Sequence, residues 1–183
     1  MARFFLTNKP KAYKRARQIN QEAGLKKAGA ISENRIRGVI YKKRINQDIN
    51  IYRQGSNHLL ATTGTIIYEG KVGIDALKKK AGDRRPLIDR KGIYGHYSII
   101  SIESVKVNIL SDRLGVYSIY YYSQEGTLFV SNSLYLTARA LDVSRVDKTG
   151  LIIRSVYVQN ITRRTPFESI KRLDGNEYIS IKE

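Results

Sequence analysis

The stretch that decides the fold is Leu110-Ser111-Asp112-Arg113-Leu114-Gly115-Val116, followed by Tyr117-Ser118-Ile119-Tyr120-Tyr121-Tyr122 and by Gly126-Thr127-Leu128-Phe129-Val130-Ser131. An apolar strand ends at Asp112, and the chain turns at Gly115 into an aromatic strand. That strand turns again at Gln124-Glu125-Gly126, and a third strand starts at Thr127. The sequence therefore predicts a tight antiparallel meander.

The length and composition predict one intracellular domain. A chain of 183 residues buries about 70% of its unfolded surface, so we expect a single domain over residues 1–183. The absence of cysteine excludes disulfides, thiolate metal sites and thiol nucleophiles. The apolar runs are far shorter than the roughly 20 residues of a membrane helix, and the first residues lack the apolar core of a signal peptide. We expect a soluble, cytoplasmic protein.

The charge is distributed unevenly along the chain. Residues 1–91 contain 22 Lys and Arg but seven Asp and Glu, whereas residues 92–183 contain 11 and nine. Such an excess attracts polyanions in a strongly salt-dependent way. It is consistent either with a solvated basic surface or with a nucleic-acid-binding surface. The candidate polyanion-binding residues are Lys11, Lys14, Arg15, Arg17, Lys26, Lys27, Lys42, Lys43, Arg44, Lys78, Lys79 and Lys80.

The residue patterns predict a mixture of helices and antiparallel strands. Helices are expected at residues 10–24, 73–81 and 134–141, from helix-forming composition, three- and four-residue apolar spacing and flanking Pro or Gly. Strands are expected at residues 4–6, 35–42, 48–53, 58–68, 94–102, 104–110, 116–122 and 127–131. We expect 35–42 to be an exposed strand, 26–34 a loop and 152–158 a buried run. The fold class is α+β.

A second motif lies near the end of the chain, at Thr165-Pro166-Phe167 and Ile170-Lys171-Arg172-Leu173-Asp174-Gly175. With the stretch around Asp112, it resembles the glutamine amidotransferase domain of the asparagine synthase family. That domain has an Asp-Arg-Leu-Gly turn, a Gly-Thr-Leu strand and a closing Ile-x-Arg-Leu-x-x-Gly. The resemblance covers residues 93–183 well and residues 1–92 only by position. It implies an N-terminal-nucleophile amidohydrolase-like four-layer sandwich, with two mostly antiparallel sheets between helices.

The residues that perform the chemistry in that family differ here. In active members the residue after the initiator Met is a cysteine, which attacks the glutamine amide with its own α-amino group as base; here it is Ala2. The family's Asn-Gly-Glu corresponds to Thr63-Gly64-Thr65, and its substrate-binding Asp to Tyr94. The resemblance therefore implies a vestigial substrate pocket at Thr63, Gly64, Thr65 and Tyr94 that does not bind glutamine as the relatives do.

Other chemistry finds little support in the residues. The family's carboxylate-binding arginine corresponds to Arg35, Arg37 or Arg44, and the sequence does not choose among them. The chain lacks the Ser-Gly-Gly-x-Asp-Ser phosphate loop of the family's synthetase domain, so we expect neither that domain nor a cofactor. His58 and His96 lack cysteine or acidic partners at metal-binding spacing, so we expect structural histidines and no metal site.

Three hypotheses follow from these residues. The first is a catalytically inactive, stand-alone amidotransferase-like domain that acts in binding or as a partner of a separately encoded synthetase-like protein. The second is a basic nucleic-acid-binding protein on the same fold, with the contacts in residues 1–91. The third is the glutaminase half of a split asparagine-synthase-like enzyme in which Ala2 is an engineered replacement for cysteine.

Overall fold

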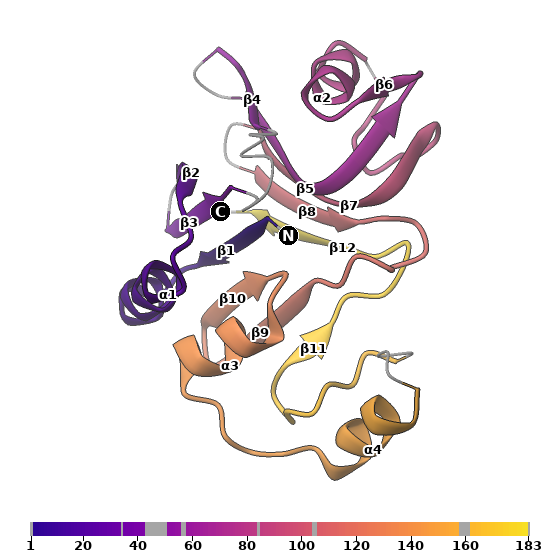
Figure 1. The fold of residues 1–183 in the computed structure, drawn as a ribbon. Helices are drawn as coiled ribbons and strands as arrows, with labels where there is room; N and C mark the ends of the chain where they lie inside the picture. The colour runs from indigo at the N-terminus through magenta and orange to yellow at the C-terminus, as the bar shows by residue number, and fades with distance from the viewer. Residues whose placement is uncertain are drawn as a thin grey trace. The chain divides into compact units, whose positions relative to one another are not determined.

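The computed structural model describes residues 2–33, 35–42, 51–55, 58–83, 85–103, 106–157 and 162–182. These residues contain four α-helices and two antiparallel sheets (Figure 1), which confirms the predicted α+β class. The chain forms two compact units: residues 1–2, 43–117 and 175–183 make the first, and residues 3–42 and 118–174 make the second. None of the described helices is both long and apolar enough to span a bilayer.

The first unit is built on one antiparallel sheet with a helix packed against it. The strands follow the order β12 (Tyr178–Lys182), β8 (Lys106–Ser111), β7 (Ile93–Glu103), β5 (His58–Tyr68) and β4 (Ile51–Gln54), and β6 (Lys71–Val72) pairs with β5. Helix α2 (Ile74–Ala81) lies against β4 and β5. Its buried Ala76 and Leu77 share a core with Leu60, Ile66 and Tyr68 of β5, because alternate side chains of that strand face the helix.

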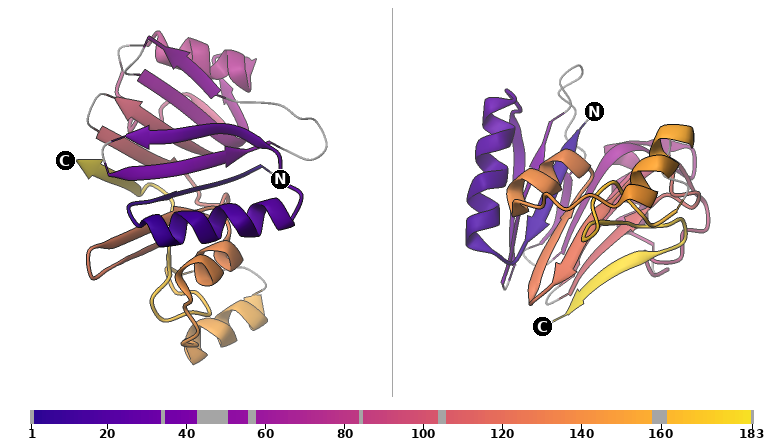
Figure 2. Two further views of the ribbon diagram at one scale, coloured as in Figure 1. Left: turned by 90° about the vertical axis from the view of Figure 1, so that its left-hand side faces the viewer. Right: turned by 90° about the horizontal axis from the view of Figure 1, so that it is seen from below.

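The second unit has its own antiparallel sheet. The strand order is β11 (Lys171–Arg172), β9 (Tyr120–Gln124), β10 (Thr127–Ser131), β1 (Arg3–Thr7), β3 (Ile36–Tyr41) and β2 (Lys27–Glu33). Helices α1 (Pro10–Glu22) and α3 (Leu134–Leu141) share one apolar core on this sheet (Figure 2), and α4 (Lys148–Tyr157) follows α3. Phe5 is central to that core, with its ring centroid 5.8 Å from Phe129 and 5.6 Å from Tyr13.

Several elements begin and end where the sequence predicts. Helix α1 starts at Pro10, whose missing N–H costs nothing in a first turn, and is followed by Gly24 at a φ of 69°. Helix α3 starts after Ser133, whose hydroxyl accepts a hydrogen bond from the Leu136 N–H. Strands β5 and β10 match the predicted ranges, and the predicted helix at residues 73–81 is α2.

The predicted meander is wrong at its first turn. Strand β8 pairs with β7 and β12, whereas β9 pairs with β10 and β11 of the other sheet, so only the β9–β10 hairpin forms as predicted. The buried carboxylate of Asp112 accepts hydrogen bonds from the N–H groups of Leu114, Val116 and Tyr117, at 3.1, 3.0 and 2.6 Å. Because these donors are occupied, Val116 and Tyr117 do not extend a ladder, and β9 begins only at Tyr120.

Three further local predictions are corrected. Residues 27–33, within the predicted loop, form β2, and β3 is buried between β1 and β2 instead of exposed. The predicted buried run at 152–158 is mostly an exposed helix, α4, and residue 158 lies outside the described residues. The helix begins there because Asp147 accepts a hydrogen bond from the Gly150 N–H at 2.9 Å. Of the strand expected at 48–53, only residues 51–53 are described, as part of β4.

The hydrogen bonds of Asp112 lead to a stability prediction. Replacing Asp112→Ala removes three acceptor contacts, including the acceptor of the buried Tyr117 N–H, which we expect to cost about 3 kcal/mol. Asp112→Asn keeps one acceptor oxygen, so it should cost roughly half as much. Urea unfolding followed by circular dichroism measures both losses. Equal unfolding midpoints for the wild type and Asp112→Ala would show that the turn does not depend on this carboxylate.

Candidate functional site

The first candidate site surrounds the start of the chain. Ala2 is buried, with 6% of its surface exposed, and it directly precedes β1. Its carbonyl oxygen accepts a hydrogen bond from the Tyr117 hydroxyl at 3.4 Å. Tyr117 is itself buried, and its position is fixed by the bond between its N–H and Asp112. The Asp112 turn therefore places an aromatic hydroxyl against the backbone of Ala2.

Gly64 contacts the same tyrosine as Ala2 does. Gly64 has a φ of 95°, and a Cβ atom there would lie 2.8 Å from Cε2 of Tyr117 and 2.2 Å from the carbonyl oxygen of His96. Only glycine tolerates both this backbone conformation and this approach. The structure thus brings together Ala2 and Gly64, two of the residues that the sequence assigned to a site, with Tyr117 between them. Sequence reasoning placed Tyr117 in the packing of an aromatic strand instead.

Thr63 lies next to Gly64 but its hydroxyl is occupied within the sheet. The Oγ1 atom of Thr63 is 2.6 Å from the Ser98 hydroxyl on β7, and Thr63 is 1% exposed. A hydroxyl held this way satisfies its neighbour and does not face a substrate. Thr63 is therefore a cross-strand polar contact of the β5–β7 ladder.

Thr65 and Tyr94 do not join this group. Thr65 is exposed and pairs with His96, and Tyr94 pairs with Ile67. Tyr94 therefore lies three residues along the ladder from the position of Gly64, about 10 Å at the rise of a β-strand. Its side chain is 65% exposed. Of the four predicted pocket residues, only Thr63 and Gly64 lie beside one another in the packed interior.

The groups around Ala2 offer little for acid–base or nucleophilic chemistry. Ala2 contributes a methyl group, and Tyr117 contributes a hydroxyl that already donates to a backbone oxygen. In the described part of the chain, no three His, Cys, Asp or Glu side chains come together as metal ligands would. His96 is exposed, and Nε2 of His58 lies 3.9 Å from the Glu103 carboxylate. Neither histidine has a partner arrangement that would make it a catalytic base.

A buried cation lies beneath the Asp112 turn. Arg90 is 6% exposed and donates a hydrogen bond from Nη2 to the carbonyl oxygen of Glu177. Burial lowers the pKa of Arg90, and burial raises the pKa of the nearby Tyr97 to about 12. Both groups therefore keep their usual protonation at neutral pH. The hydrogen bond from Arg90 holds the residue before β12 within the first unit, and we assign Arg90 a structural role.

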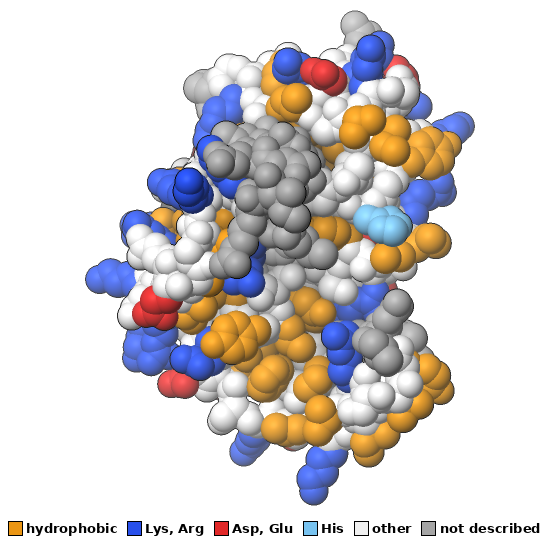
Figure 3. Space-filling view, in the orientation of Figure 1, with side chains coloured by type: hydrophobic (Ala, Val, Ile, Leu, Met, Phe, Trp, Pro, Cys, Tyr) orange, Lys and Arg blue, Asp and Glu red, His pale blue; other side chains and the backbone are white. Residues whose placement is uncertain are grey.

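The basic residues of the second unit remain available to solvent. Figure 3 shows Lys and Arg side chains gathered over α1 and β2. Lys11, Lys14 and Arg17 are exposed on α1, which has no acidic residue in its first turn. Arg15 forms an ion pair with Asp142 at 3.4 Å. Lys26 and Lys27 are also exposed, and the Lys42 N–H bonds to the Lys26 carbonyl at 2.9 Å, so these two predicted clusters adjoin.

The basic residues after β5 are engaged within their own unit. Lys78 lies 3.6 Å from Asp75, and Lys79 lies 3.4 Å from Glu69. Lys80 was expected to face a polyanion, but it is 3% exposed and its Nζ bonds to the Arg85 carbonyl at 3.0 Å. Lys80 is therefore corrected to a buried structural cation. The predicted Lys43 and Arg44 lie outside the described residues.

The structure brings Lys9 together with Arg35 and Arg37, two of the three arginines that the sequence offered for carboxylate binding. Lys9, Arg35 and Arg37 line a cavity of about 290 Å³ at the start of α1, together with Thr7, Asn8 and Pro10. The pairing of Thr7 with Arg37 creates this group, because it puts the start of β3 beside the end of β1. Arg35 and Arg37 therefore lie beside the C-terminal end of β1, whereas Arg3 lies at its N-terminal end. A cross-strand register of this kind leaves no local sequence signal.

Comparisons with known proteins give only distant likenesses. No family model and no curated protein sequence matches the chain. Over all of this chain, one similar solved structure is a glutamine phosphoribosylpyrophosphate amidotransferase from B. subtilis complexed with ADP and GMP, at 10% identity and a TM-score of 0.48. Another, titled as the allosteric regulatory enzyme of purine biosynthesis, has 10% identity and a TM-score of 0.49. The chain spans 49% of each of these structures.

The contact between Gly64 and Tyr117 can be tested against a matched glycine. Gly64→Ala introduces both an unfavourable φ and overlap with His96 and Tyr117, whereas Gly70, at a φ of 72°, has open space around its Cα. We expect Gly70→Ala to cost about 1 kcal/mol and Gly64→Ala at least about 2 kcal/mol more. Urea unfolding of both variants measures the difference. Similar losses for the two would mean that Tyr117 does not pack on Gly64 as described.

Proposed function

We propose that this protein is an amidotransferase-like domain that has lost glutaminase chemistry and acts by binding, as the partner of a synthetase-like protein. The observation that carries the proposal is the environment of Ala2. The residue at the nucleophile position is a buried methyl group, held through its carbonyl by Tyr117. A glutamine amide entering there would meet no thiolate, and the mechanism of the resembled family requires one.

The residues beside Ala2 support the same proposal. In the resembled family, an asparagine side chain helps to hold the developing oxyanion, and a glutamate helps to hold the substrate. Their counterparts here are Thr63, which is bonded to Ser98, and Thr65, which is exposed beside His96. Tyr94 replaces the substrate-binding carboxylate with a neutral, exposed ring. A single change at residue 2 therefore would not supply the missing substrate contacts.

Nucleic-acid binding is the second candidate function. It is favoured by the cations of the second unit, where Lys11, Lys14 and Arg17 form no ion pair among the described residues, in contrast to Lys78 and Lys79. The cavity lined by Arg35 and Arg37 extends this basic surface to the start of α1. Guanidinium groups bind phosphate through two parallel hydrogen bonds, so the pair suits a nucleic-acid backbone.

The loss of glutaminase chemistry predicts that cysteine alone does not restore it. We expect neither the wild type nor Ala2→Cys to release ammonia from glutamine, because Thr63, Thr65 and Tyr94 supply no substrate contacts. Ammonia release is measured by a coupled glutamate dehydrogenase assay, with mass spectrometry verifying that Met1 has been removed. Activity in the wild type would refute the proposal. Activity in Ala2→Cys alone would favour a glutaminase whose natural residue 2 is cysteine.

The basic surface predicts salt-dependent binding of DNA or RNA. Replacing Lys11, Lys14 and Arg17 with Gln should weaken binding and reduce the slope of log K against log salt by about 0.9 for each lost duplex phosphate contact. The control is Lys78→Gln with Lys79→Gln, because these ion-paired lysines should leave the slope unchanged. Fluorescence anisotropy measures both. Absence of wild-type binding at about 50 mM salt would eliminate this candidate function.

A further inference from the structure

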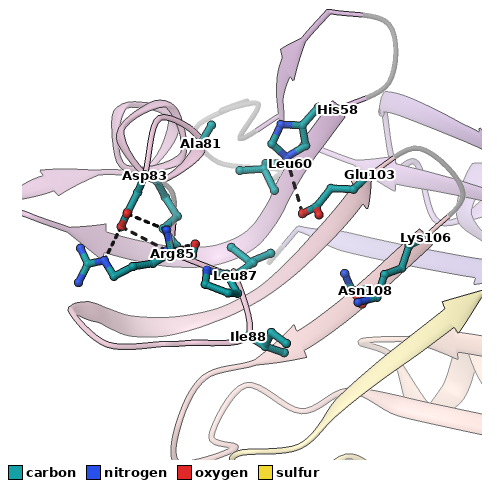
Figure 4. Close-up of a pocket in the computed structure, with 12 residues that line it drawn as sticks. His58, Leu60, Ala81, Asp83, Arg85, Leu87, Ile88, Glu103, Lys106 and Asn108 are labelled. Carbon is teal, nitrogen blue, oxygen red and sulfur yellow. Dashed lines mark hydrogen bonds and ion pairs between the residues drawn. The ribbon is translucent and has the colours of Figure 1, made fainter.

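A separate cavity in the first unit has the features of a small-molecule site. Its volume is about 260 Å³, and residues of β5, β7, β8 and the segment after α2 line it. Figure 4 shows His58 and Glu103 on one wall, Lys106 and Asn108 on another, and Asp83 with Arg85 beyond the apolar residues. This volume lies just below the usual range for drug-sized ligands, which suits a smaller compound.

The polar wall of this cavity is created by strand register. His58 pairs with Glu103 across β5 and β7, and Glu103 pairs with Lys106 across β7 and β8. One row further, Leu60, Ser101 and Asn108 lie side by side in the same sheet. Residues two apart on a strand face the same side, so Leu60 and Asn108 of the second row line the cavity together with the first row. The Glu103 carboxylate thus lies between a histidine and a lysine.

Asn108 supplies the strongest indication of a ligand. It is 6% exposed, it lines the cavity, and its side-chain oxygen has no hydrogen-bond partner among the described residues. An unsatisfied buried polar group costs about 1–3 kcal/mol. The oxygen is covered in this structure, so a ligand that donates an N–H or O–H to it would recover that cost once the amide turns toward the cavity. The ligand therefore carries a hydrogen-bond donor.

The opposite wall is rigid before any ligand binds. Buried Lys80 donates from Nζ to the Arg85 carbonyl at 3.0 Å and lies 3.4 Å from the Asp83 carboxylate. Arg85 Nε donates to that carboxylate at 2.8 Å. The Tyr68 hydroxyl also donates to Asp83, which lowers the pKa of Asp83 and raises the pKa of Tyr68 to about 12. These charges are mutually satisfied, so they shape the cavity without requiring a counter-ion.

Lys106 and Glu103 are the charges that remain for a ligand. Lys106 takes part in none of the ion pairs among the described residues. One Glu103 oxygen accepts a hydrogen bond from the Ser101 hydroxyl at 2.7 Å and lies 3.9 Å from Nε2 of His58, which leaves the second oxygen for a ligand. Opposite charges on adjacent strands disfavour a multiply charged anion such as phosphate, because Glu103 would repel it. They favour a ligand that itself carries both signs. Buried Leu60 and Leu87 with partly exposed Ile88 add an apolar surface beside them.

We propose that this cavity binds a free α-amino acid with an aliphatic side chain. The ligand ammonium group donates to the Asn108 oxygen and the Glu103 carboxylate, and its carboxylate pairs with Lys106. The side chain packs on Leu60, Leu87 and Ile88. This assignment is independent of glutaminase chemistry and of nucleic-acid binding, because it uses neither Ala2 nor the cations of the second unit.

The probe is L-leucine, compared by isothermal titration calorimetry with isocaproate, isoamylamine and inorganic phosphate. Isocaproate lacks the ammonium group, and isoamylamine lacks the carboxylate. We expect L-leucine to bind at least tenfold more tightly than any of the other three. Absence of L-leucine binding at about 10 mM, the weak end of ligand affinity, would overturn the proposal. So would equal or tighter binding of either truncated compound, and tighter phosphate binding would indicate an anion site.

Variants locate the binding in the cavity. Lys106→Met and Asn108→Leu should each weaken L-leucine binding at least tenfold. The matched control is Lys182→Met, because Lys182 pairs with Lys106 on β12 but does not line the cavity. Circular dichroism verifies folding, and Lys106→Met tests the proposal even if buried Asn108 does not tolerate leucine. Undiminished L-leucine affinity in folded Lys106→Met would overturn the assignment.

Discussion

The hydrogen bonds that three backbone N–H groups donate to the Asp112 carboxylate determine where one sheet ends and the other begins. They use the donors of Leu114, Val116 and Tyr117, so the chain cannot return beside β8 as a hairpin. Close by, a Cβ atom on Gly175 would lie 2.5 Å from the Arg113 carbonyl, and the Leu173 N–H bonds to Ile119 at 2.8 Å. The two motifs that carry the family resemblance are thus the two places where the second half of the chain passes between units. Their residues specify this connection and perform no chemistry themselves.

The elements that could be predicted are those whose boundaries are set by neighbouring residues. Helix α3 has a serine cap, α1 starts at a proline, and β10 starts after a glycine turn, so a short window of sequence contains the information. Strand β2 and the burial of β3 depend instead on the partner strands, which no local pattern identifies. The apolar residues 151–157 were ambiguous between strand and helix, and Asp147, which caps α4, was the signal that could have decided it.

The candidate sites likewise contain some residues that a local motif identifies and others that only strand pairing brings together. Ala2 and Gly64 were identified through a motif, and the structure joins them through Tyr117, whose role depends on the Asp112 turn. The walls of the amino-acid cavity come from strands far apart in sequence, so only register brings Glu103 beside Lys106. The same holds for Arg37 beside Thr7. Residues that act through cross-strand pairing carry no spacing signal of their own.

The two units also differ in how many of their Lys and Arg side chains form ion pairs. Residues 69–85 contain both acids and bases within a few helical turns, so Lys78, Lys79 and Lys80 find partners locally. Helix α1 has no such acids in its first turn, and its Lys11, Lys14 and Arg17 side chains are exposed to solvent. The excess charge of the first 91 residues therefore becomes an external field mainly on the second unit, whereas Lys78, Lys79 and Lys80 of the first unit are paired. A polyanion and a small zwitterion would consequently not compete for the same residues.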